Sequence, residues 1–87
     1  MNYQILDTIK QAGRTRTILK IIYIEKDGTS EGWRYVEPYS FIGEGDNEAL
    51  FAWDVSKDGI RRFTLNRIDQ AESTSEHFVP RFTAEIV

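Results

Sequence analysis

The sequence has no cysteine, two prolines, one methionine and a single histidine, His77, among its 87 residues. Without cysteine it can form neither disulfides nor thiolate metal sites, which fits a reducing compartment. His77 has no cysteine or second histidine with which to build a catalytic dyad or a zinc site. We therefore expect a protein that is not an enzyme and that holds no metal and no cofactor.

The sequence also lacks any apolar run long enough to cross a bilayer, and its first residues do not have the pattern of a signal peptide. Hydrophobic residues make up 40% and charged residues 29% of the chain, which is ordinary for a globular protein. These properties predict one small domain over residues 1–87, cytoplasmic and without membrane contact.

Positive charge is scarce overall but locally concentrated. The formal net charge is −3, so attraction of the whole protein to nucleic acid is not expected. Residues 8–24 and 59–68, however, contain basic side chains and no acid. The acids gather elsewhere, for example over residues 44–48, where an exposed acidic loop explains them better than a calcium site because the EF-hand pattern is missing. A local basic site therefore remains possible in an acidic protein.

The first residues predict one amphipathic helix over about residues 2–12. Asn2 can cap its start, and Ile5, Leu6, Ile9 and Ala12 then share one face. Gly13 suits its C-terminal stop.

The remaining sequence is typical of short strands, at about residues 16–26, 33–42, 48–55, 60–66 and 68–75. The tripeptide Lys-Asp-Gly occurs twice between strand candidates and predicts two hairpins. Pro38 marks an edge, a bulge or a bend, and the polar fifth strand suits a sheet edge. One helix followed by about five strands predicts a mainly β fold: a small curled sheet or barrel over about residues 16–76, with the helix across one opening and a tail over residues 77–87.

The residues best suited to binding are arginines and aromatics. One arginine guanidinium can bind two phosphate oxygens at once, and aromatic faces stack on nucleobases. This pattern fits a nucleotide or single-strand binder, but Tyr23, Trp53 and Phe63 equally suit core positions. Its members are Tyr23, Trp33, Arg34, Tyr35, Trp53, Arg61, Arg62, Phe63 and Arg67.

The segment Arg61–Ile68, "RRFTLNRI", contains three of these arginines. Strict alternation places Arg61 and Arg67 on the buried Phe63 face and points Arg62 away from them. The two could face a phosphate if the strand bends or ends there, as strands do at barrel rims. Alternatively, Arg67 is an internal arginine paired with a carboxylate such as Glu37 or Asp54.

Three segments are similar to the WYL domain family. They are Ile21-Ile22-Tyr23 with the following Lys-Asp-Gly turn, Arg34-Tyr35-Val36-Glu37-Pro38, and Arg61–Ile68. The ending Phe78-x-Pro80 also resembles the family, so the similarity covers about residues 4–82. Of the three residues that name the family, only the leucine has a counterpart, at Leu50.

The resemblance implies a small Sm-like (Src-homology-3-like) five-stranded β-barrel. It also implies a domain of bacterial transcription regulators or defence-associated proteins, which senses single-stranded DNA or a nucleotide and switches an attached DNA-binding domain. By position, Arg61 and Arg67 would contact the anion, with Tyr23 and Arg34 nearby. Arg62 and Trp53 complete the predicted ligand site as a further cation and an aromatic support.

Two functions are therefore expected from the sequence. The first is a non-enzymatic sensor that binds single-stranded nucleic acid or a nucleotide-like anion and controls an attached or partner transcription regulator. The second is a protein-interaction or homo-oligomerisation module that uses barrel edge strands, with the arginines in structural roles.

Overall fold

The computed structural model describes residues 3–82 and has the predicted mainly β fold with one leading helix. Helix α1 (Tyr3–Thr15) precedes five strands: β1 (Thr17–Tyr23), β2 (Trp33–Ile42), β3 (Ala49–Asp54), β4 (Gly59–Thr64) and β5 (Ile68–His77). Two short 3₁₀ turns, η1 (Gly45–Asn47) and η2 (Leu65–Arg67), precede β3 and β5. The predicted cap, Asn2, lies outside the described residues.

Helix α1 is longer than the sequence indicates. It continues through Gly13 to Thr15, so the predicted stop at Gly13 is wrong. Glycine costs a helix interior about 1 kcal/mol, which packing of a helix face can offset. Arg16, with φ 56°, takes the left-handed conformation after the helix and turns the chain into β1.

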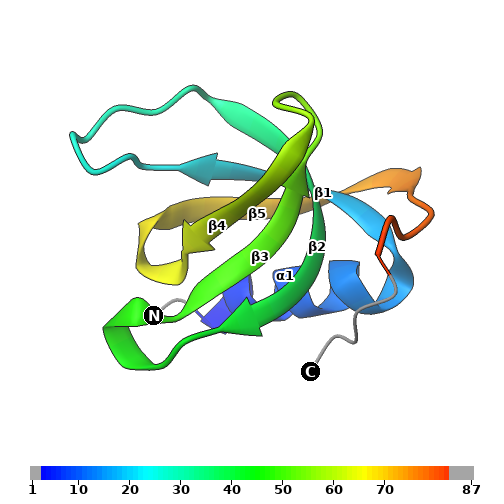
Figure 1. Ribbon diagram of the computed structural model, residues 1–87, viewed down its shortest axis with the longest axis horizontal. Helices are drawn as coiled ribbons and strands as arrows, with labels where there is room; N and C mark the ends of the chain where they lie inside the picture. Colours follow the sequence, from blue (N-terminus) through cyan, green and yellow to red (C-terminus); the bar gives the residue numbers. More distant parts are fainter. Residues whose placement is uncertain (1–2, 83–87) are drawn as a thin grey trace.

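The five strands form one antiparallel sheet in the order β4-β3-β2-β1-β5. The sheet is curled, with α1 packed against β5, β1 and β2, while the long β1–β2 connection extends from the other side of the sheet (Figure 1). Strand pairing does not close the barrel, so β4 and β5 are both edges. The prediction that the polar fifth strand lies at an edge is confirmed.

Pro38 lies in an interior strand, where proline is normally excluded because it cannot donate to the ladder. The pairing of β2 with β3 shifts register between Pro38 and Ser40. Of the three predicted possibilities, the structure therefore shows a bulge, which accommodates the missing donor and bends β2.

Both predicted hairpins are present, but their connections differ. The β3–β4 turn is short, and Asp58 in it has a left-handed φ of 54°. The β1–β2 connection runs over residues 24–32. Within it, Gly28 at φ 87° donates from its N–H to the carbonyl of Glu25 (2.9 Å), so Lys26-Asp27-Gly28 forms a turn inside a longer loop. Glu25 lies where this loop leaves the sheet.

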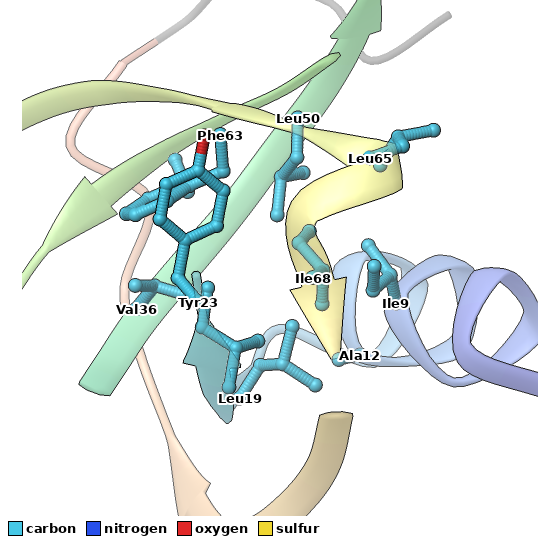
Figure 2. Close-up of a cluster of buried hydrophobic side chains, with 11 residues drawn as sticks. Ile9, Ala12, Leu19, Tyr23, Val36, Leu50, Phe63, Leu65 and Ile68 are labelled. Carbon is cyan, nitrogen blue, oxygen red and sulfur yellow. The ribbon is translucent and has the colours of Figure 1, made fainter. Parts of the chain in front are cut away.

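The core fills the concave side of the sheet. Alternate residues of β1 are buried, as expected for a strand with one face against a core. Figure 2 shows Tyr23 and Phe63 together in this core, with Ile9 and Ala12 brought to it by α1. Phe63 is completely buried, and its position fixes where the neighbouring residues of β4 lie.

Candidate functional site

Three arginines from separate elements gather around Glu25. Arg34 from β2 pairs with its carboxylate through Nη1 and Oε2 at 2.9 Å, and Arg61 from β4 approaches through Nη2 and Oε1 at 4.0 Å. Arg67, at the end of η2, donates from Nη1 to the backbone carbonyl of the same residue at 3.1 Å. The structure thus brings together three of the predicted ligand-binding residues.

Arg34 is the internal arginine of the fold. Its side chain is 3% exposed, and its Nη2 lies 3.0 Å from Oδ2 of Asp54, which is 1% exposed. The other carboxylate oxygen of Asp54 accepts the backbone N–H groups of Ser56 and Lys57 in the β3–β4 turn. The suggested pairing of Arg67 with Asp54 or Glu37 is therefore wrong. Arg34 pairs with Asp54, and Arg81 pairs with Glu37.

Arg61 lies at the mouth of the core. Its side chain is about one-third exposed, and its guanidinium lies 5.2 Å from the centre of the Phe63 ring. Strand β4 ends at Thr64 and η2 follows, so the chain leaves the strand path before Arg67. This ending releases Arg67 from the strand alternation, whereas Arg61 stays on the Phe63 face of β4 and is only partly exposed.

Tyr23 supports this arrangement from β1. Its ring meets Phe63 edge-on, with centroids 5.0 Å apart, and its hydroxyl accepts the backbone N–H of Thr64 at 3.1 Å. The side chain is almost completely buried. Tyr23 therefore fixes the end of β4 and does not offer an open face on which a nucleobase could stack.

Arg62 and Trp53 have partners other than Glu25, although Arg62 borders the same hollow as Arg61. Arg62 is exposed, alternates with Arg61 and Phe63, and donates to the carbonyl of Asn47 at 2.9 Å. Trp53 lies on the convex face, where the Arg81 guanidinium sits 4.6 Å from the centre of its ring. The grouping of all six residues into one site is therefore not what the structure shows.

Two open hollows flank the cluster. One, of about 560 Å³, is bordered by Tyr23, Glu25, Lys26, Asp27, Arg61, Arg62 and Thr64. The other, of about 510 Å³, is bordered by Ile24, Asp46, Thr64, Asn66, Arg67, Ile68 and Asp69. At the first hollow, the side chain and backbone N–H of Thr29 donate hydrogen bonds to the Asp27 carboxylate. These bonds order this part of the loop and lower the pKa of Asp27. Both hollows are shallow, so a ligand would lie across the surface.

The cluster carries more positive than negative charge. Three guanidinium groups face two carboxylates, those of Glu25 and Asp54, which leaves one positive charge in excess. Among residues 3–82, no group of three or more histidines, cysteines or acids is placed to hold a metal ion. Guanidinium groups in such a cluster are chemically suited to hydrogen-bond the oxygens of an anion.

A second polar cluster lies on the convex face and was not predicted. Arg81 pairs with buried Glu37 through two bonds, Nε to Oε1 at 2.9 Å and Nη2 to Oε2 at 3.1 Å. Tyr39 donates its hydroxyl to Glu37 and accepts the backbone N–H of Arg81. Burial raises the pKa of Tyr39, and the hydrogen bond to Glu37 raises that of Arg81. These contacts hold the segment after β5 against the sheet.

The fold and the arginine cluster at its rim define a class of small, mainly β domains with one leading helix and guanidinium groups near the surface. Within that class, the WYL domain family model matches residues 4–73, so the chain belongs to the WYL domain family. The match includes Glu25 and all three clustered arginines, and it ends before the segment that contains Arg81. No curated protein matches the sequence.

A solved structure gives a relative for the fold. Proteasome accessory factor B/C (PafBC) of Arthrobacter aurescens superposes with a TM-score of 0.77 at 25% sequence identity. The alignment covers 86% of this chain and 12% of that one, so the chain spans a small part of the protein that it resembles. Within residues 3–82, α1 is too short and too polar to be a membrane-crossing helix.

Proposed function

We propose that this domain is a regulatory sensor that binds single-stranded nucleic acid or a nucleotide-like anion and controls an attached or partner transcription regulator in the cytoplasm. The carrying observation is the meeting of Arg34, Arg61 and Arg67, from β2, β4 and η2, beside open hollows. Membership of the WYL family and the likeness to PafBC support the regulatory role. No catalytic step is proposed, because the cluster pairs cations with acids and offers no nucleophile held by a base.

Within the cluster, the three arginines have different roles. Arg34 is buried and its charge is balanced by Asp54, so it holds the cluster in place and does not itself reach the surface. Arg61 and Arg67 are half-buried and border separate hollows. A phosphate at the first hollow would therefore meet the Arg61 guanidinium, which reaches the surface as bidentate recognition requires, whereas Asp46 and Asp69 border the second hollow beside Arg67 and disfavour an anion there.

The test is fluorescence anisotropy of a labelled, 5′-phosphorylated single-stranded oligonucleotide at low and moderate salt. Wild-type protein should bind, and binding should weaken as salt rises because phosphate contacts release counterions. The Arg61→Ala/Arg67→Ala variant should lose most of this affinity. Its salt slope should fall by about 1.4, since each phosphate contact on a single strand contributes about 0.7.

The matched control is Lys10→Ala/Arg14→Ala, which removes two exposed positive charges from α1. It changes the net charge equally and should leave the slope nearly unchanged. Single Arg62→Ala and Trp53→Ala variants then test whether the two residues outside the cluster take part. Wild-type protein that binds nothing at low salt, or a double arginine variant that binds as well as its control, would refute the proposal.

The free edges of the sheet support a second function, assembly with a protein partner or another copy. Strand β5 is an edge over its ten residues, and most of its side chains are exposed. An edge strand offers unpaired backbone groups to which a further strand can add. Such assembly should resist salt and appear as a mass that rises with concentration in sedimentation velocity.

A further inference from the structure

Glu25 is the common contact of the arginine cluster. Its carboxylate meets Arg34 and Arg61, and its backbone carbonyl accepts from Arg67. We propose that Glu25 is an internal competitor of the ligand: its carboxylate occupies the position of an incoming anionic group, and binding displaces it. This inference rests on the proposed anion-binding function and names how that site is regulated.

The two acids of the cluster are held very differently. Asp54 is 1% exposed, and its carboxylate is held by Arg34 and by two backbone N–H groups of the β3–β4 turn. The side chain of Glu25 is 31% exposed and is held by guanidinium groups. Glu25 can therefore leave the cluster at much lower cost than Asp54, which has no route to solvent.

The backbone around Glu25 allows its side chain to leave. Its N–H donates to the carbonyl of Thr29 at 2.8 Å, and its carbonyl accepts from Gly28 and Arg67. These bonds hold the main chain and leave the carboxylate free to turn about its side-chain bonds. A rotamer change would thus move the carboxylate into solvent without opening the loop.

Charge balance favours exchange with a phosphate. With Glu25 in place, three guanidinium groups face two carboxylates. When its carboxylate moves out, Asp54 alone remains, so the cations attract an incoming anion more strongly. Carboxylate and phosphate use the same paired guanidinium geometry, so a phosphate can take over the contacts that Glu25 gives up.

The experiment compares Glu25→Gln with Glu31→Gln in the anisotropy assay. Glu31 lies in the same loop, is about half-exposed and pairs with Lys57 on the surface at 3.3 Å, so both variants lose one negative charge. Glu25→Gln should bind the 5′-phosphorylated oligonucleotide about tenfold more tightly than wild type, since a weaker competitor must be displaced. Glu31→Gln should change affinity by less than about twofold, as expected for a screened surface charge.

Urea unfolding without the oligonucleotide separates competition from a structural role. Glu25→Gln should lower the unfolding midpoint, because buried Arg34 loses a charged partner, while its affinity for the oligonucleotide rises. A purely structural residue would lower both. Should Glu25→Gln fail to fold, Glu25→Asp is the second variant, because it retains the charge on a shorter side chain. The shorter carboxylate should contact Arg34 and Arg61 more weakly, so the oligonucleotide should displace it more easily and bind more tightly than to wild type.

The possible failures can be distinguished. Binding by wild type that Glu25→Gln increases no more than Glu31→Gln would overturn the competition while leaving the proposed function intact. Absence of binding by folded wild type at low salt would refute the proposed function itself.

Discussion

The buried pair between Arg34 and Asp54 should be the most sensitive polar contact of the domain. We expect Asp54→Asn to destabilise it strongly. Asparagine has nearly the same shape and keeps an oxygen for the N–H groups of Ser56 and Lys57, so the turn and the packing are preserved. The substitution removes the negative charge that lies 3.0 Å from the Arg34 guanidinium.

The magnitude follows from burial. Breaking a buried ion pair by removing one partner costs about 3–5 kcal/mol, because the remaining charge stays desolvated. Glu25 still pairs with Arg34, so we expect the lower end, about 3 kcal/mol. For a domain of this size that corresponds to a fall in Tm of about 12–24 °C. The free energy of unfolding of a domain of this length is on the order of 4–13 kcal/mol, so a loss of about 3 kcal/mol should be easy to measure and should leave the variant only marginally folded.

The assay is urea unfolding followed by tryptophan fluorescence, with Asp58→Asn as control. Asp58 is exposed in the same turn and has a left-handed φ of 54°, which asparagine tolerates. The control should differ from wild type by less than about 0.5 kcal/mol. The deficit of Asp54→Asn should persist at high salt, because buried pairs are poorly screened. A loss under about 1 kcal/mol at unchanged m-value would refute the stabilising role given to this pair.

Two further predictions concern tyrosines. Tyr23→Phe should cost about 1 kcal/mol in urea unfolding, since the Thr64 N–H loses its acceptor at a half-buried site, and an unchanged midpoint would contradict this role. Burial raises the pKa of Tyr39, so its contribution to stability is fully present below the usual tyrosine value of about 10 and is lost as pH rises through the folded pKa. Absorbance titration should therefore show one late tyrosine in wild type that Tyr39→Phe lacks.

Strand positions were predictable because burial repeats every second residue. Residues 33–42 were expected as a strand and form β2, including the disturbance at Pro38. The helix end was not predictable from local signals. Gly13 has the chemistry of a stop, but the chain continues helical until Arg16 turns it toward β1. Tertiary packing of the helix face decided the boundary there.

The arginines of the site could be found from the sequence, but their partners could not. Alternation correctly turned Arg62 away from Arg61 and required the strand to end before Arg67. Which arginine becomes internal depends on which side chain reaches Asp54 across the sheet, and that is Arg34. The register of the strands and the course of the loops decide which arginine meets which acid, and neither can be read from the residue types alone.

The contacts at Glu37 show the same limit more strongly. Its partner Arg81 is 44 residues away in sequence, in a segment without strand or helix periodicity. A glutamate before a proline in a strand has many possible partners, and composition favours none of them. The segment after β5 settles the choice because it folds back over the convex face, where Trp53 and Tyr39 already provide an aromatic surface.

If the domain senses an anion, as we propose, it must fold stably without one, and this requirement accounts for the two acids of the cluster. Arg34 is too deeply buried to be left unpaired, so it needs a permanent partner, which Asp54 supplies from a fixed turn. Arg61 lies nearer the surface and needs a partner that can leave. Glu25 meets that condition because its carboxylate contacts both arginines and still reaches solvent. If Asp54 secures the fold and Glu25 occupies the ligand position, Asp54→Asn should lower stability more than Glu25→Gln and raise affinity less, because only Glu25 has to be displaced.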